Sequence, residues 1–141
     1  MRNCNYFKLS NFILEFVGSF LLVFFAAGAV MANAFYNGQI GQLMGGFSSG
    51  IILFILIFCL GKYSRGHVNP AVSYMEFRMG YIGFNTMIFY SVFQILGSIA
   101  AGYFLKLIFG NIVNIGSNLP QLQVELNYFI SFIVEFILSL I

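Results

Sequence analysis

The sequence predicts an all-α membrane protein that folds as an inverted-repeat helical bundle. Three observations support this fold class. Of the 141 residues, 60% are hydrophobic and only 7% are charged, whereas about a quarter of the residues of a soluble domain are charged. Several apolar runs are long enough to cross a bilayer. A stretch near the start, 12–19, recurs near the end, at 132–139.

The first two apolar runs predict two membrane-spanning helices. The run at 12–32 carries Glu15 near its start, and as a helix it is about 31 Å long, enough for a hydrocarbon core of about 30 Å. A short uncharged loop at 33–42, which contains two glycines, separates it from a second run at 43–60. After the second crossing the chain is back on its original side.

A polar turn at 62–69 interrupts the apolar pattern and is followed by a short helix. Asn69 is a favoured N-cap residue, and Pro70 is favoured at the first helical position, where its missing N–H costs nothing. The helix predicted at 70–79 is about 15 Å long, half the thickness of a membrane. We therefore expect a re-entrant half-helix whose N-terminus points into the membrane interior. Non-helical backbone at that depth must be buried in protein or line a water-filled path.

A third spanning helix is predicted at 83–109. It contains Gln94 and two pairs of small residues, Gly97 with Ala101 and Ser98 with Gly102, a spacing that lets helix backbones approach closely. After a polar loop at 111–125, a truncated fourth helix begins at 127 and covers about 22 Å by residue 141. The expected architecture is three full transmembrane helices, one half-helix and a truncated fourth helix, in a single transmembrane domain over 1–141.

The two similar stretches predict an internal repeat. Phe, Ile, Glu, Phe and Ser recur in register between 12–19 and 132–139. Phe and Ile are common in this chain and match easily by chance, but the matching glutamates, Glu15 and Glu135, are among only four acidic residues. Three crossings separate the copies, so the second copy enters from the opposite face, as in inverted-topology repeats. We expect 1–126 to form the first repeat and 127–141 to start the second.

Charge and reactive residues exclude several functions. Six Lys and Arg and four Glu give a net charge of +2, too little for the basic stripe that nucleic-acid binding needs. There is no Asp, and His67 is the sole histidine, so we expect no metal site, no cofactor and no enzymatic activity. The spacing of Cys4 and Cys59 fits neither a metal site nor a redox motif, which predicts free thiols.

The positions of the basic residues predict the orientation. Lys and Arg precede the first span and lie between the second and third, whereas the loops on the other side have none. The positive-inside rule then places the N-terminus and the 62–69 turn in the cytoplasm. Lys106, near the outer end of the third span, is an exception that can snorkel to the interface.

The stretch Ser64-Arg65-Gly66-His67-Val68-Asn69-Pro70-Ala71-Val72-Ser73 resembles the first Asn-Pro-Ala loop of the aquaporin and glycerol-facilitator (major intrinsic protein) family. The resemblance extends to residues 15–20, 94–97 and 134–136, in the same order along the chain. It covers the N-terminal half of that family and the start of its second repeat. It implies a passive channel for water or small uncharged solutes such as glycerol-like polyols, urea or metalloid acids. It also implies a homotetramer of complete subunits in the cell membrane.

Within this resemblance, Asn69, Pro70 and Ala71 form the pore motif, and the carbonyls of the three residues before it form a ladder of acceptors, Gly66, His67 and Val68. The selectivity-filter position lies twenty residues before Asn69, which is Ser49; a shift of one residue would give Ser48 or Gly50. A small residue there suggests a filter wider than one for water alone. Glu15 and Glu135 would brace the two Asn-Pro-Ala loops. The second such loop and the constriction Arg of the family lie outside these 141 residues.

Two other functions remain open at this point. Inverted repeats and broken helices are equally typical of ion-coupled secondary transporters, in which Glu15 or Glu135 would be the coupling group. The short chain also fits a non-conducting membrane scaffold that acts as a half-subunit.

Overall fold

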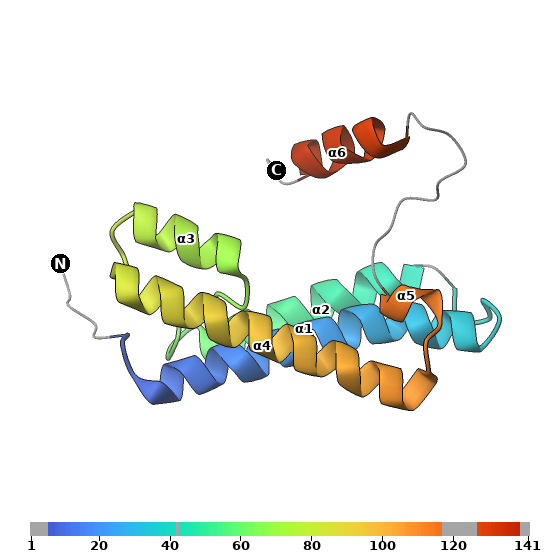
Figure 1. Cartoon of the computed structure of the whole chain (residues 1–141), viewed down its shortest axis with the longest axis horizontal. Coiled ribbons are helices and arrows are strands. Elements are labelled where there is room, and N and C mark those ends of the chain that lie inside the picture. Colours follow the sequence, from blue (N-terminus) through green and yellow to red (C-terminus); the bar gives the residue numbers. More distant parts are fainter. Residues whose placement is uncertain (1–5, 42, 117–126, 139–141) are drawn as a thin grey trace.

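The computed structural model describes residues 6–41, 43–116 and 127–138, and all regular structure within them is helical. The elements in order are α1 (Leu9–Phe35), α2 (Leu43–Leu60), α3 (Pro70–Arg78), α4 (Phe84–Phe109), α5 (Val113–Gly116) and α6 (Asn127–Leu138) (Figure 1). In the described part of the chain, α1, α2 and α4 are long and apolar enough to cross a membrane. This confirms the predicted all-α membrane fold.

The core of the bundle is the contact between α1 and α4. These helices run side by side, and α2 packs against α1 (Figure 1). At Gly97 the two backbones come so close that a Cβ atom would overlap the Phe16 carbonyl oxygen. Ala101, one turn further along α4, is completely buried. The small-residue pair Gly97 and Ala101 therefore faces α1 as predicted, whereas Gly102 has open space beside it.

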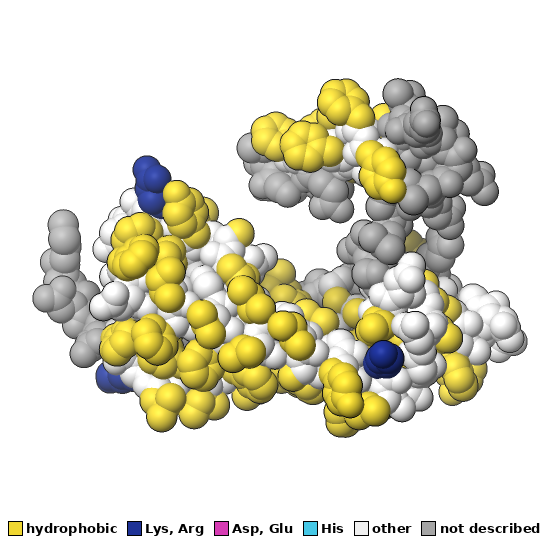
Figure 2. All heavy atoms as spheres, in the orientation of Figure 1, with side chains coloured by type: hydrophobic (Ala, Val, Ile, Leu, Met, Phe, Trp, Pro, Cys, Tyr) yellow, Lys and Arg dark blue, Asp and Glu magenta, His cyan; other side chains and the backbone are white. Residues whose placement is uncertain are grey.

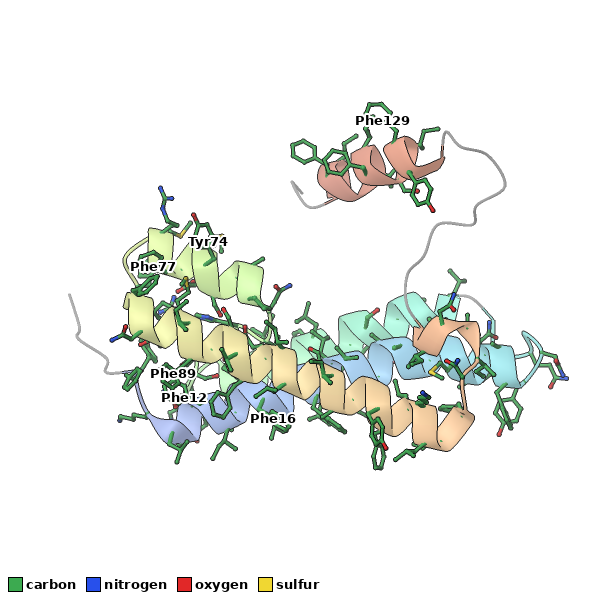
Figure 3. All side chains as sticks on the ribbon, in the orientation of Figure 1. Phe12, Phe16, Tyr74, Phe77, Phe89 and Phe129 are labelled. Atoms are coloured by element: carbon green, nitrogen blue, oxygen red, sulfur yellow. The ribbon has the colours of Figure 1, made fainter. Side chains whose placement is uncertain are left out.

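An aromatic cluster joins the N-terminal ends of α1 and α4 (Figure 3). Phe12 stacks on Phe89 with ring centroids 5.2 Å apart, and it meets the edge of Tyr90 at 5.9 Å. Such pairs add about 0.5–1.5 kcal/mol beyond the apolar area that they bury. This cluster holds α1 against α4 at the end of the bundle where α3 also lies.

Helix α1 is three residues longer at each end than the hydropathy pattern predicted. The extra residues include Asn11, whose side chain donates to the Tyr6 carbonyl, and Asn33, whose side chain accepts from the Gly41 backbone. These polar side chains interrupt the apolar run but not the helix, because each finds a local partner. The chain turns only after Phe35, where Asn37 and Gly38 adopt positive φ angles.

Helix α3 is the predicted half-helix. Its nine residues make about 14 Å of helix. Its N-terminus lies part-way along the bundle, and its C-terminus lies at the end where α1 and α4 begin (Figure 1). It packs only against α4 among the described helices.

The C-terminal part matches the prediction less closely. The loop expected at 111–125 contains α5, a short left-handed turn with φ of 47° at Asn114 and 58° at Ile115, and Gly116 packs against the Ala27 backbone. Helix α6 corresponds to the predicted fourth helix. It contacts no other described helix, and its apolar side chains from Tyr128 to Ile137 are exposed. The predicted repeat boundary at 126 and Ser139 lie outside the described residues.

On the face drawn in Figure 2, hydrophobic side chains are spread along the length of the bundle, and Lys and Arg side chains show at only a few places. This distribution suits a molecule whose sides contact lipid acyl chains.

Candidate functional site

The site is built on the loop between α2 and α3, which folds inward instead of running over the surface. Gly66, His67 and Val68 are buried, and φ is positive at Arg65 (72°), Gly66 (63°) and Val68 (44°). Positive φ is rare for a β-branched residue such as Val68. A backbone of this kind persists only where surrounding contacts determine it.

Glu15 on α1 supplies the main contacts to this loop. Its Oε1 accepts hydrogen bonds from Ser64 Oγ (2.6 Å) and from the His67 backbone N–H (3.1 Å). Its Oε2 accepts from the Val68 backbone N–H (2.7 Å) and from Gln94 Nε2 (2.7 Å). The side chain is 0% exposed. The carboxylate thus holds two backbone groups of the loop and ties them to α4.

A polar network continues from Glu15 across the loop to α3 and α4. Gln94 Nε2 also donates to Ser73 Oγ (3.0 Å), and Ser73 Oγ lies 3.0 Å from His67 Nδ1. The His67 ring meets the ring of Tyr90 edge-on at 5.2 Å. The His67 side chain therefore links the loop to Ser73 on α3 and to Tyr90 on α4.

Val68 rests directly on α1. Its carbonyl accepts from Ser19 Oγ at 3.1 Å. A Cβ atom on Gly18 would lie 2.5 Å from Val68 Cγ1 and 2.8 Å from Leu60 Cδ1. Gly18 is therefore the residue that allows the loop to approach α1 so closely.

Asn69 caps α3 in the way that its position next to Pro70 predicts. Its backbone is extended, and its Oδ1 accepts from the Ala71 N–H at 2.8 Å. The cap uses the oxygen of the side chain, so its remaining hydrogen-bonding group is an NH₂ donor. Asn69, Pro70 and Ala71 are exposed, and the positive end of the α3 dipole lies beside them.

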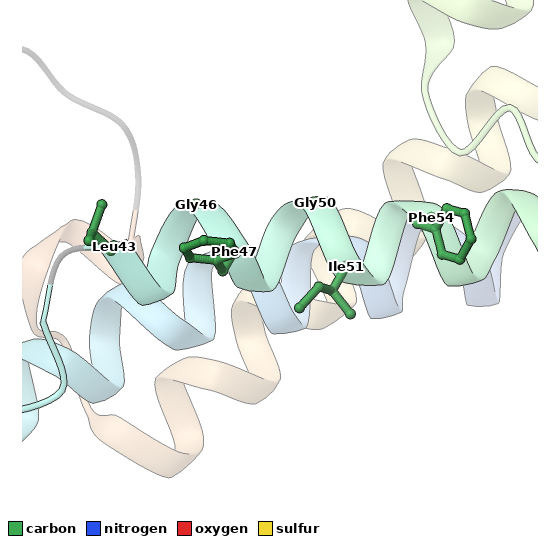
Figure 4. Close-up of a pocket in the computed structure, with 6 residues that line it drawn as sticks. All are labelled: Leu43, Gly46, Phe47, Gly50, Ile51 and Phe54. Atoms are coloured by element: carbon green, nitrogen blue, oxygen red, sulfur yellow. The ribbon is translucent and has the colours of Figure 1, made fainter.

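The filter candidates on α2 face three different surroundings. Ser48 Oγ donates to the Phe25 carbonyl on α1 (2.9 Å), whereas Ser49 Oγ donates to carbonyls of its own helix at 2.8 and 3.1 Å. Gly50 lines an open groove of about 480 Å³ (Figure 4). The groove is formed by Leu43, Gly46, Phe47, Gly50, Ile51 and Phe54. Among the three candidates Ser49 keeps its hydroxyl away from both the helix contact and the apolar groove.

Arg65 forms a second set of contacts, which the sequence did not predict. Its Nε lies 2.8 Å from Glu76 Oε2, and its guanidinium lies 5.0 Å from the ring centre of Tyr81 and 5.9 Å from that of Tyr6. Burial opposes the charge of Arg65, but hydrogen bonds with Tyr6 and Glu76 outweigh it, so the pKa of the guanidinium lies above its ordinary value.

The structure brings together Glu15, the three carbonyl residues and Asn69, while Ser49 lies apart on α2. Glu135 falls within α6, but its side chain is outside the described set. Sequence reasoning missed the roles of Ser19, Ser64 and Ser73 and the contacts of Gln94. Their signal was polar side chains within or beside apolar helices, where each needs a partner. Across the described residues, no three His, Cys, Asp or Glu side chains are grouped to hold a metal ion.

A comparison with models of known protein families shows the family of this chain. The family model described as major intrinsic protein matches residues 3–141. The chain belongs to this family. With three helices long and apolar enough to cross a membrane in its described part, it is an integral membrane protein.

Individual relatives are similar over most of the chain. Aquaporin NIP3-1 of Oryza sativa subsp. japonica is 31% identical over 124 residues, which are 86% of this chain and 40% of the relative. Aquaporin A of Dictyostelium discoideum is 32% identical over 131 residues, 92% of this chain and 47% of the relative. A probable NIP-type aquaporin of Nicotiana alata is 29% identical over 138 residues, which are 93% of this chain and 50% of the relative. The chain thus spans about half the length of these relatives or less.

Proposed function

We propose that this major intrinsic protein, as part of a complete aquaporin-like molecule, is a passive channel for water and small uncharged solutes. Glycerol-like polyols, urea and metalloid acids are the solute classes we include. The proposed assembly is a homotetramer in the cell membrane, with the N-terminus in the cytoplasm. The observation that carries this proposal is the half-helix α3, which is capped by Asn69 part-way along the bundle and follows a loop held by buried Glu15.

The proposed pore groups act through hydrogen bonds of opposite polarity. The Asn69 NH₂ group donates to an oxygen of the solute, and the carbonyls of Gly66, His67 and Val68 accept from its O–H or N–H groups. The Val68 carbonyl already accepts from Ser19, but a carbonyl oxygen has a second lone pair. The positive end of the α3 dipole opposes cations and protons. Ser49 is the proposed filter residue on α2, where its hydroxyl oxygen acts as an acceptor.

Glu15 has the properties of a brace and not of a coupling group. It accepts four hydrogen bonds from within the protein and is 0% exposed. A carboxylate has about four lone-pair sites, so a transported ion or proton would have to displace an existing donor. This arrangement favours a channel over an ion-coupled transporter. We assign Glu135 the same bracing role in the second repeat.

Replacing Asn69 by Asp separates its two roles. Aspartate is as good an N-cap as asparagine, so α3 keeps its start, but the NH₂ donor is lost and a negative charge is added. We expect the water and glycerol permeability of vesicles containing the complete protein to fall roughly tenfold, the effect of losing about one hydrogen bond. We also expect exclusion of protons and cations to weaken. Stopped-flow light scattering and a proton-sensitive dye measure the two effects.

Asn37→Asp is the matched control, because Asn37 lies in the exposed α1–α2 connection, and it should leave both measurements unchanged. Unaltered permeability and proton exclusion in Asn69→Asp would contradict the proposed mechanism. Saturating flux that depends on a proton or sodium gradient would identify a transporter instead. Vesicles that do not swell faster than empty ones would identify a scaffold.

A further inference from the structure

Arg65 connects four separate segments at the end of the bundle where α3 terminates. It lies in the loop before α3, pairs with Glu76 on α3, and has its guanidinium near Tyr81 of the α3–α4 turn and Tyr6 before α1. Its side chain is 34% exposed and that of Glu76 is 15% exposed. The pair is therefore partly shielded, and solvent and salt weaken it less than a fully exposed ion pair.

The pair links the two limbs of the re-entrant segment. Arg65 precedes the Asn69 cap on the inward limb, and Glu76 follows it on the returning helix. Glu15 holds the same loop at His67 and Val68, from the side of α1. The backbone from Arg65 to Val68 includes three residues with positive φ, Arg65, Gly66 and Val68, so the loop has no regular structure of its own to keep it in place.

We propose that Arg65 is a positioning residue for the permeation path. Its ion pair with Glu76 fixes the spacing of the two limbs and thereby the direction in which Asn69 and the loop carbonyls face. This inference rests on the proposed channel function and adds a determinant of its selectivity. If Arg65 acted only through its charge at the pore entrance, the positive charge would have to stay at position 65. If Arg65 acts as a positioning residue, the ion pair is what matters, and the two charges can be exchanged.

The test compares Arg65→Ala, Glu76→Ala and the exchanged pair Arg65→Glu with Glu76→Arg. Alanine at 65 keeps a Cβ atom, so the preference of the backbone at positive φ changes little. One readout is hydrogen–deuterium exchange of residues 61–69 in lipid nanodiscs. The other is the ratio of glycerol to water permeability in vesicles containing the complete protein, because a change in the number of folded channels alone leaves this ratio unaltered.

We expect each alanine variant to speed exchange of the loop roughly tenfold and to shift the permeability ratio roughly threefold, as contacting residues commonly couple to this extent. The exchanged pair should restore both values to within about twofold of the original. Arg78→Ala is the control, since Arg78 is exposed and its side chain donates to Tyr74 on the same helix. It should change neither readout.

Unchanged exchange and an unchanged ratio in Arg65→Ala would overturn the proposal. Single variants that alter the ratio without rescue by the exchanged pair would overturn it in favour of a charge at the entrance. If the alanine variants do not reach the membrane, Arg65→Gln and Glu76→Gln, which remove one charge of the pair but keep most of the side-chain volume, are measured in the same way. A complete protein that passes neither water nor glycerol would contradict the proposed channel function. The hydrogen–deuterium exchange data alone would then decide whether the Arg65–Glu76 pair holds the loop.

Discussion

At the scale of single residues, Glu15 has the largest local effect. It is a fully buried carboxylate with hydrogen bonds to Ser64, to the backbone of the loop and to Gln94. Hydrogen bonds to a charged group contribute about 1.5–3 kcal/mol each, and a buried donor that loses its acceptor costs about 1–3 kcal/mol. The position of the loop therefore depends strongly on this one side chain.

Glu15→Gln should destabilise the protein by about 3 kcal/mol, because the amide replaces one acceptor by a donor that faces other donors. The free energy of unfolding in mixed micelles measures this effect. Ser98→Ala serves as the control: Ser98 Oγ donates to the Gln94 carbonyl of its own helix, and we expect a change below about 0.5 kcal/mol. Equal stability of Glu15→Gln and the original protein would show that the four hydrogen bonds do not hold the loop.

The sequence could identify Glu15 but not its partners. A glutamate in an apolar run is visible in any sequence, and the resemblance to the aquaporin family implied its bracing role. The donors Ser64 and Gln94 are 49 and 79 residues away, and only the packing of α1 against the loop and α4 brings them together. The positive φ of Val68 was unpredictable for the same reason, since valine has no intrinsic preference for that conformation.

At the scale of helices, the contact between α1 and α4 determines how tightly the bundle packs. Gly97 allows the α4 backbone to meet the Phe16 carbonyl, whereas Gly102 on the same helix has nothing within 4 Å of where a Cβ would be. Both glycines are helical, so the intrinsic helix propensity favours alanine by about 1 kcal/mol at each. The difference between them isolates the cost of forcing the helices apart.

Gly97→Ala should therefore destabilise the protein by about 1–3 kcal/mol, the usual cost of overpacking. Gly102→Ala should be neutral or slightly stabilising. The same unfolding measurement in micelles compares the two variants. Destabilisation of equal size in both would mean that the close approach at Gly97 has no energetic role.

The helices themselves were largely predictable, because length and hydropathy are local properties. The bounds of α2 were predicted as observed, and α3 and α4 agree to within a residue. The ends of α1 were predicted too short because Asn11 and Asn33 interrupt the apolar run, and their local hydrogen bonds keep them within the helix. The left-handed turn of α5 has no sequence signal, since Val113, Asn114 and Ile115 include two β-branched residues.

At the scale of the whole molecule, apolar surface remains uncovered on both α2 and α6. The groove on α2 and the phenylalanines of α6 are exposed in the described part of the chain (Figures 2 and 4). The matched relatives are about twice as long as the chain or longer. Lipid and the second half of an aquaporin-like molecule are the surroundings that such surfaces suit.

The orientation in the membrane can be tested with single cysteines. In a background in which Cys4 and Cys59 are replaced by Ser, we expect Lys62→Cys to react with a membrane-impermeant thiol reagent only from the cytoplasmic side. Gln39→Cys should react only from the opposite side. Both positions are exposed and lie in connections at opposite ends of α2. Reaction of both cysteines from one side, or the reverse pattern, would contradict the predicted topology.

The 79-residue separation of Glu15 and Gln94 has a consequence during synthesis. A ribosome that adds about 5–20 residues per second completes Gln94 roughly 4–16 s after Glu15. A charged side chain costs about 2.5–3.5 kcal/mol at the centre of a lone inserted helix, and Glu15 lies near the start of α1, closer to the membrane surface. In that interval the nascent first helix can therefore keep its carboxylate near the hydrated interface, and the carboxylate becomes fully enclosed only when its later partners are made.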